Sequence, residues 1–483
     1  MELATEQIHI LMVSFTAQGH INPMLRLAKR LQSKGGIHVS LATTELARER
    51  MLKYSTTITT TEENNSPTAL SIFGINILFF SDGMSLDYDR RADMETYMNT
   101  MAEFGPINLS NTIKDLYQKG SPKFSHMIIN PFVPWATNVA EELEIPCSLL
   151  WIQPCSVFSI YYHFLNKLAD FPTSDNPETS VQLPGLPFLS STDLPSLVLP
   201  SNPFPSITKC LVEIFKSMNY FKYVFANSFY ELEKDAIPSH VPIKPVGPLI
   251  PSTLLGQDKC LDVGIDMWKS DDACLQWLDQ RPENSVLYVA FGSLAVLTKP
   301  QMQNIATALR NCANMGFIWV VKPPDFPSPD GSGVVPEGFA EETKERGMVV
   351  PWCNQGLVLS HRSVACFLSH CGWNSLLEAV SAGVPVIGFP QWSDQPTNAR
   401  MLSDVWGVGV RVCPGEDGVV GSEQIEKCVQ EVVSGSRAAK YRAKAMNWKR
   451  AARDAVADGG SSEKVIEVFI DDVVRSSKSM CLN

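Results

Sequence analysis

Two kinds of apolar pattern alternate along the chain: short continuous runs and helical spacings. The run Ile8–Phe15 has the apolar pattern of a strand. Asn22 and Pro23 then place a helix N-cap residue before a proline at the first helical position, and apolar residues within Met24–Leu31 recur at helical spacing. A second strand is predicted at Ile37–Thr43. This order predicts a βαβ unit, which builds parallel sheets.

The same alternation continues through most of the chain. The other predicted strands are His126–Ile129, Cys147–Ile152 and Tyr223–Asn227 in the first half, and Ser285–Phe291, Gly316–Val321, Val364–Leu368 and Pro385–Pro390 in the second. The helical patterns between them include Ala136–Leu143, Gln301–Arg310 and Leu376–Ala382. A chain of 483 residues exceeds the roughly 250–300 residues at which single cores stop growing. We therefore expect two α/β domains.

Breaks in the pattern set the expected boundaries. Proline-rich residues 242–251 have little periodicity and suit the exit from a first domain. Asp458–Ser462 should break the chain again, and Val465, Ile466, Phe469, Val473 and Val474 then lie on one face of a helix that must dock on an apolar surface. We expect a first domain at 1–247, a linker at 248–272, a second domain at 273–455 and a C-terminal helical segment at 456–483.

Composition excludes several classes of protein. Hydrophobic residues make up 45% of the chain and charged residues 19%, which is ordinary for a globular protein. The net charge of −11 and the lack of a long basic run argue against nucleic acid as a partner. The twelve cysteines show no zinc-ligand spacing and predict buried thiols in a reducing, cytoplasmic setting. No stretch approaches the roughly 20 apolar residues that span a bilayer, so no membrane partner is expected.

The candidate chemistry is concentrated in Trp352–Gln395. There, the strand pattern Val364–Leu368 is followed by a turn at Gly372–Ser375 that opens a helix. The N-terminus of a helix exposes unpaired N–H groups and carries about half a unit of positive charge. This end of the predicted helix suits an anionic phosphate. His370, Asn374 and Ser375 would add side-chain donors there, enough to hold a diphosphate without a metal ion.

Other side chains of this segment match the remaining parts of a nucleotide sugar. Glu378, one turn along the same helix, could accept two ribose hydroxyls, and Trp352 offers a flat face to a base. Asp394 and Gln395 follow a predicted strand and are of types that read sugar hydroxyls. Each residue alone has an ordinary structural explanation, as core, helix cap or solvated charge. Their joint occurrence favours a sugar-nucleotide site.

Trp352–Gln395 resembles the 44-residue signature of plant family-1 UDP-dependent glycosyltransferases. Similarity extends over Ile8–Pro23, Phe225–Lys234, Val286–Ser293 and Asp458–Ser462, and thus over nearly the whole chain. The resemblance implies two facing Rossmann-like domains of the GT-B type, the first binding the acceptor and the second the UDP-sugar, with a C-terminal helix returning to the first. It also implies a monomeric hexosyltransferase of plant secondary metabolism that inverts the anomeric centre, uses UDP-glucose as co-substrate, and needs neither cofactor nor metal.

The resemblance also assigns donor contacts position by position. Trp352 and Cys353 would meet uracil, Gln355 and Glu378 the ribose, Ser293, His370, Asn374 and Ser375 the phosphates, and Trp373, Asp394 and Gln395 the sugar, with the closing Gln typical of glucose preference. Asn354 and Leu376 stand where the family usually has Pro and Thr, at positions not expected to contact the donor.

His20 is the candidate catalytic base. It lies just before the predicted helix, whose N-terminus disfavours an imidazolium and keeps the ring neutral. In the family the matching His deprotonates the acceptor, and its usual partner is an Asp. Asn130 occupies that partner position here. An amide oxygen can orient the ring but supplies no negative charge, which predicts a weak base suited to readily ionised acceptors.

A carboxylic acid, with a pKa near roughly 4, needs little help to ionise. Phenolic acids and acidic flavonoid hydroxyls are therefore favoured over aliphatic alcohols. Asn130–Ala136 and Trp151–Gln153 also resemble the subset of the family that makes glucose esters of aromatic acids, and Asp394–Val412 resembles a sister subset. Loops near Phe80–Asp89 and Trp151–Tyr162 are expected to build the acceptor pocket.

Three alternatives remain open on the sequence alone. Asp87-Tyr88-Asp89 is the Asp-x-Asp pattern of metal-dependent transferases, although it lies far from the diphosphate segment. A non-catalytic sugar-nucleotide sensor is conceivable because Asn130 weakens the catalytic pair. Transfer to carbon on an acidic polyphenol ring also needs little base strength.

Overall fold

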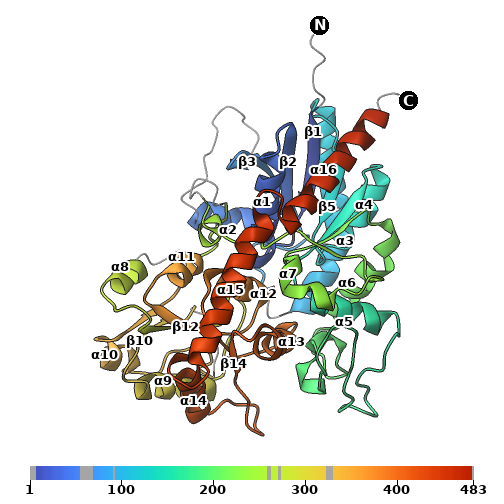
Figure 1. The fold of residues 1–483 in the computed structure, drawn as a ribbon. Helices are drawn as coiled ribbons and strands as arrows, with labels where there is room; N and C mark the ends of the chain where they lie inside the picture. Colours follow the sequence, from blue (N-terminus) through green and yellow to red (C-terminus); the bar gives the residue numbers. More distant parts are fainter. Residues whose placement is uncertain are drawn as a thin grey trace.

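The computed structural model describes residues 7–54, 69–90, 93–257, 263–269, 273–322 and 330–480, and it contains two parallel-sheet layers (Figure 1). The first sheet has the strand order β3-β4-β2-β1-β5-β6-β7-β8. Its strands are β1 (Ile8–Val13), β2 (Ile37–Thr44), β3 (Ala69–Ile72), β4 (Ile75–Phe80), β5 (His126–Ile129), β6 (Cys147–Trp151), β7 (Val224–Ala226) and β8 (Lys244–Pro245). All neighbours pair in parallel except the edge strand β3.

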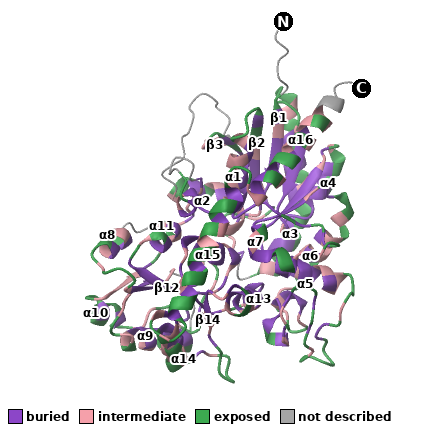
Figure 2. Cartoon of the chain, in the orientation of Figure 1, coloured by how far each residue is buried: buried purple, intermediate pink, exposed green. Residues whose placement is uncertain are grey.

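The second sheet is parallel throughout, in the order β11-β10-β9-β12-β13-β14. Its strands are β9 (Val286–Ala290), β10 (Gly316–Val320), β11 (Gly347–Val350), β12 (Val364–Ser369), β13 (Val386–Gly388) and β14 (Gly409–Arg411). Every residue of the central strands β9 and β12 is buried, as expected for strands covered by helices on both faces (Figure 2). The two Rossmann-like layers and the α/β class that the sequence predicts are confirmed.

Helices cover both faces of each sheet (Figure 1). In the first half these are α1 (Gln18–Gln32), α2 (Glu45–Tyr54), α3 (Met94–Gln118), α4 (Ala136–Glu142), α5 (Cys155–Leu165), α6 (Pro205–Lys216) and α7 (Tyr230–Glu233). In the second they are α8 (Ala273–Asp279), α9 (Lys299–Asn311), α10 (Phe339–Thr343), α11 (Gln355–Ser360), α12 (Trp373–Ala382), α13 (Gln395–Arg400), α14 (Ser422–Val433), α15 (Ala438–Val456) and α16 (Ser461–Met480).

Period-2 alternation divides the first sheet's side chains between two cores. Ile10 and Met12 of β1 belong to the core under α1 and α16, whereas Leu11 and Val13 belong to the core under α3 and α4. The strand is therefore apolar on both faces, which is why it reads as a continuous hydrophobic run in the sequence.

The first helix starts earlier than the sequence predicts. Ala17 is its extended N-cap residue, and the Ala17 carbonyl accepts the N–H groups of His20 and Ile21. The prediction that Asn22 caps this helix is wrong, and Pro23 lies inside it. The Asn22 side chain instead exchanges two hydrogen bonds with the backbone of Ile265, so its capping capacity is used elsewhere. Likewise, α12 begins at Trp373, before the predicted run at Leu376.

The C-terminal helix returns to the first sheet, as expected. Figure 1 shows α16 running from the second domain along the first, beside β1. Ile466, Phe469 and Val473 are buried in the core under α1. Glu463 pairs with Arg30 at 2.9 Å and also contacts Lys34. Parts of the predicted linker, 258–262 and 270–272, lie outside the described residues, as do the last residues 481–483 of the C-terminal segment.

Within the described ranges, no helix combines the length and apolar character that crossing a bilayer demands. The cysteines in those same ranges carry free thiols, most of them buried, with Cys413 exposed.

Replacing Phe469 by Ala should destabilise the first domain. The ring is 1% exposed and makes edge contacts with His126, Tyr223 and Phe225. Loss of a buried aromatic side chain costs about 3–5 kcal/mol of unfolding free energy. Val468→Ala, at a side chain that is 53% exposed on the same helix, is the matched control. Equal shifts of the urea unfolding midpoint for the two variants would show that α16 is not anchored through Phe469.

Candidate active site

A cavity of about 560 Å³ lies between the two domains and is lined by residues of both. Its walls follow the carboxyl ends of strands: Phe15 after β1, Phe132 after β5, Ser293 after β9 and His370 after β12. Ligands of open parallel sheets bind at this edge. The lining includes most of the predicted site residues, namely His20, Ser293, Trp352, Cys353, Gln355, His370, Trp373, Asn374, Ser375, Glu378, Asp394 and Gln395.

Asn130 is buried outside the cavity lining and contacts two residues that line it, His20 and Phe132. Its Oδ1 is 3.0 Å from Nδ1 of His20 and also accepts the backbone N–H of Phe132 at 3.0 Å. An N–H donor can bind only the carbonyl end of the amide, so Oδ1 faces the ring. Nδ1 therefore carries the hydrogen, and Nε2 is the proton-accepting atom.

The environment of His20 disfavours its charged form. Burial lowers the pKa of His20 to about 4, and the hydrogen bond with Asn130 opposes this only in part. Aromatic rings pack around the imidazole, with Phe15 at 5.1 Å and Phe132 at 4.8 Å between ring centroids. The ring is consequently neutral at pH 7, which agrees with the sequence-based prediction.

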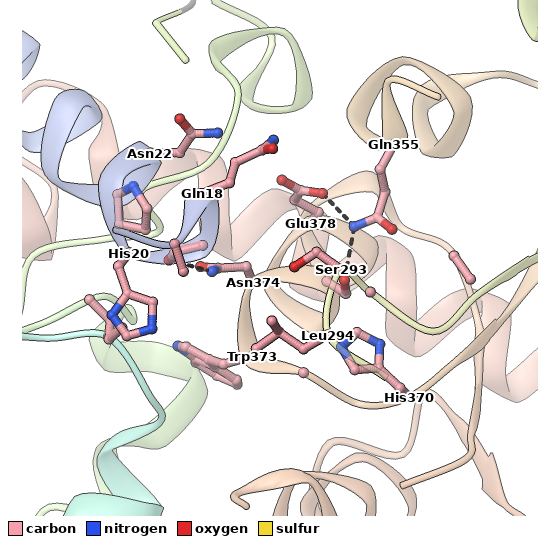
Figure 3. Close-up of a pocket in the computed structure, with 18 of the residues that line it drawn as sticks. Gln18, His20, Asn22, Ser293, Leu294, Gln355, His370, Trp373, Asn374 and Glu378 are labelled. Carbon is pink, nitrogen blue, oxygen red and sulfur yellow. Dashed lines mark hydrogen bonds between the residues drawn. The ribbon is translucent and has the colours of Figure 1, made fainter. Parts of the chain in front are cut away.

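Two glycines form a close cradle around His370. A Cβ at Gly292 would lie 2.6 Å from Nε2 of His370, and Gly292 also has φ of +72°. A Cβ at Gly372 would clash with the same atom. Burial lowers the pKa of His370 to about 4, so its ring is neutral. The loop after β9, with Ser293, and the start of α12 therefore meet around this imidazole (Figure 3).

Gln355 joins the first turn of α11 to α12. Its Nε2 donates to Oε2 of Glu378 at 2.8 Å and to Oγ of Ser375 at 3.0 Å (Figure 3). Gln355 and Glu378, the two residues matched to ribose, are thus in direct contact. Asn354, where the family usually has Pro, caps α11 by accepting the N–H of Leu357.

The predicted uracil platform has an aromatic neighbour that the sequence did not indicate. Trp268 lies 4.8 Å from Trp352 between ring centroids, and the ammonium of Lys322 lies 4.7 Å from the Trp268 ring. Cys353 is 5% exposed, with its Sγ 3.6 Å from the hydroxyl of Tyr288.

Gln18, Asn22 and Arg26 hold the segment that carries Trp268. These three side chains recur at a spacing of four on one face of α1 and hydrogen-bond residues within 263–267. The sequence shows the spacing of these three polar residues, but it does not show which segment they contact.

The two residues matched to the sugar lie at the start of α13, where Asp394 ends the loop after β13 and Gln395 is the first helical residue. Oε1 of Gln395 accepts the backbone N–H groups of Gln391 and Trp392, which directs its NH₂ group as the donor. Oδ2 of Asp394 accepts a hydrogen bond from Nδ2 of Asn398 at 2.7 Å. Burial raises the pKa of Asp394 to about 6. Asp394 is therefore largely ionised at pH 7 and can accept hydroxyl hydrogens.

The indole N–H of Trp373, which the sequence matched to the sugar, already has a partner within the protein. The residue is 4% exposed, and its indole N–H donates to the backbone carbonyl of Asn227 at 2.6 Å. Its polar atom is thus already used, although the residue lines the cavity.

The two loops expected to build the acceptor pocket contribute little to the cavity lining. Of the two loops expected there, Phe80–Asp89 contributes nothing to the lining and Trp151–Tyr162 contributes only Ile152 and Gln153. Met94, Met98 and Ile207 line it instead, together with the aromatic residues Phe15, Phe132 and Trp392. The start of α3 and α6 thus replace the predicted loop.

Asp87 and Asp89 do not form part of this cavity. Across the described ranges, no group of three or more His, Cys, Asp or Glu side chains is arranged to hold a metal ion. The Asp-x-Asp pattern lies in the connection between β4 and α3, where Asp87 is exposed.

Comparison with known proteins agrees with this geometry. Residues 264–456 match the family described as UDP-glucoronosyl and UDP-glucosyl transferase. The chain is 39% identical to the limonoid UDP-glucosyltransferase of Citrus unshiu, over 97% of this chain and 90% of that one. It is 40% identical to gallate 1-beta-glucosyltransferase 84A24 of Punica granatum, over 97% and 89% respectively. The crystal structure of Os79 from O. sativa in complex with UDP aligns with a TM-score of 0.81 and 29% identity, over 96% of this chain and 100% of that chain.

The chain belongs to the plant UDP-glucosyltransferase family, and it is an enzyme of that family. The predicted resemblance to family-1 enzymes, including the ester-forming subset, is thereby confirmed.

Asn130→Asp should move the pH dependence of the reaction. A carboxylate beside Nδ1 of His20 favours the imidazolium and raises the pKa of His20 by about 1–3 units. The base acts when deprotonated, so the acid limb of kcat/KM with a phenol acceptor should move to higher pH. Asn138→Asp adds the same charge at an exposed position of α4 and should leave the limb in place. A limb that does not move in Asn130→Asp would show that His20 is not the titrating base.

Proposed function

We propose that the enzyme transfers glucose from UDP-glucose, with inversion, to a small aromatic acceptor, preferably a phenolic carboxylic acid, and otherwise an acidic flavonoid or phenol hydroxyl. The observation that carries the proposal is the pairing of His20 with the neutral amide of Asn130 at 3.0 Å. This pair orients a base without strengthening it. An acceptor that ionises by itself makes the smallest demand on such a base.

In the proposed reaction, the acceptor oxygen forms a bond to the anomeric carbon as the bond from that carbon to the phosphate oxygen breaks. UDP leaves with the electron pair of the broken bond. A neutral hydroxyl acceptor gives its proton to Nε2 of His20, whereas a carboxylate arrives without one. Attack from the first domain, opposite a diphosphate held by α12, inverts the anomeric centre.

The donor is proposed to lie along the second domain. Trp352 and the backbone of Cys353 face the base, Gln355 and Glu378 bind the ribose, and Asp394 with the NH₂ of Gln395 binds the sugar. The N-terminus of α12 and the donors Ser293, His370, Asn374 and Ser375 bind the diphosphate. Trp373 supports this site by packing, since its N–H is bonded to Asn227.

The acceptor side of the cavity supports an aromatic ligand. Phe15, Phe132 and Trp392 offer ring faces and edges, and Met94 and Met98 offer adaptable apolar surface. Gallate is an aromatic acid and a limonoid is not, and the relatives named for these two acceptors are about equally similar to this chain. The apolar aromatic lining and the weak base favour the aromatic acid.

We expect the enzyme to form glucose esters of benzoic or cinnamic acids faster than glucosides of a simple phenol. The carboxylate needs no deprotonation, so its kcat/KM should exceed that of phenol by at least about tenfold at pH 7. Products are distinguished by mild alkali, which cleaves an ester, and by acid, which cleaves an O-glycoside but not a C-glycoside. No ester at any pH, with phenol glucosylated readily, would contradict the proposal.

His20→Ala separates the two acceptor types in the same assay. Phenol transfer should fall by about 10²–10⁴-fold, the usual contribution of a general base, while transfer to the acid should fall much less.

Activity should be retained in a chelator, because side-chain and backbone donors at α12 take the role that a divalent ion has in metal-dependent transferases. Initial rates with excess EDTA should match those with EDTA presaturated by Mg²⁺. A rate restored only by added Mg²⁺ or Mn²⁺ would show that the diphosphate is held through a metal.

A further inference from the structure

Asn227 lies at the carboxyl end of β7, fully buried and outside the cavity lining. Its side chain nevertheless joins the two domains. Oδ1 accepts the backbone N–H of Leu249 at 2.7 Å, and Nδ2 donates to Oδ1 of Asn374 at 3.3 Å. Its backbone carbonyl accepts the indole N–H of Trp373. One residue of the first domain therefore contacts the first two residues of α12.

These contacts fix the orientation of the Asn227 amide first, and through it the orientation of the Asn374 amide. The Leu249 N–H can bind only an oxygen, so the NH₂ group of Asn227 must face Asn374. That NH₂ group requires an oxygen in turn, which places Oδ1 of Asn374 toward Asn227. The NH₂ group of Asn374 consequently points the other way and donates to the carbonyl of Gly19 at 2.8 Å.

The Gly19 carbonyl is available because of Pro23. In a helix this carbonyl would pair with the N–H of the residue four positions later, and proline has no N–H. Gly19 directly precedes His20, so the Asn374 contact holds the turn that carries the candidate base. Figure 3 shows Asn374 between His20 and Ser293. An NH₂ group carries two hydrogens, and Gly19 takes one.

We propose that Asn227 is a positioning residue: it orients the Asn374 amide so that the same NH₂ group holds Gly19 and donates to the donor's diphosphate. Diphosphate binding and the placement of His20 are thereby linked through one side chain. This inference rests on the proposed binding of the UDP-glucose diphosphate at α12.

Asn227→Asp tests the link with an almost unchanged shape. Its Oδ1 keeps the Leu249 contact, but an oxygen now faces Asn374 and the Asn374 amide must turn over to donate to it. The Asn374 oxygen then faces both Gly19 and the diphosphate. We expect UDP to bind at least about tenfold more weakly, measured by calorimetry. Uridine, which lacks phosphate, should bind within about twofold of wild type.

Asn374→Ala distinguishes orientation from simple charge repulsion. Without the Asn374 amide, adding Asn227→Asp should weaken UDP binding by less than about twofold further. An undiminished effect in this background would overturn the inference, as would a parallel loss of uridine binding. If Asn227→Asp does not fold, Asn227→Ala tests the same link without adding a charge. We expect Asn227→Ala to weaken UDP binding about threefold, and to have no such effect when Asn374→Ala is already present.

The inference and the proposed function fail in different ways. Wild-type protein that binds no UDP would contradict the proposed function. Wild-type protein that binds UDP, beside Asn227 variants that bind it equally well, would overturn only the positioning role.

Discussion

Parallel pairing is the constraint on which the site depends. Strands that run the same way leave all their carboxyl ends at one edge of a sheet, and each of the two sheets presents that edge to the shared cavity. Polar residues can gather there without interrupting either core, because the strands behind them are apolar on both faces. His20 and His370, which are 350 positions apart in the chain, line one cavity for this reason.

The hydrogen bond between His20 and Asn130 gives this arrangement its chemical character. A carboxylate in place of the amide would stabilise the imidazolium, whereas the amide only fixes which nitrogen carries the hydrogen. Burial against Phe15 and Phe132 disfavours the charged ring further. The amide orients the ring without raising its basicity, whereas an Asp would do both. This difference is the basis for proposing acceptors that ionise on their own.

The residues that the sequence assigns to the donor line the cavity, whereas the loops that it assigns to the acceptor mostly do not, for a physical reason. Apart from Ser293, the residues matched to the donor fall within Trp352–Gln395, where a strand, a turn and a helix place them by local rules of chain geometry. The acceptor wall draws on Met94, Ile207 and Trp392, which share no local pattern and meet only through tertiary packing. Strand positions such as His126–Ile129 were also predictable, because parallel strands are continuous apolar runs.

The start of α1 shows where such local rules fail. Asn22 before Pro23 is a sound N-terminal signal, yet the helix begins at Gln18 and both residues serve contacts across the molecule. Asn22 holds Ile265, and Pro23 leaves the Gly19 carbonyl to Asn374. Asn22 and Pro23, which look like a local capping signal, thus allow α1 to contact the linker and the second domain. Polar side chains that break a local rule are accordingly the ones to examine for contacts between domains.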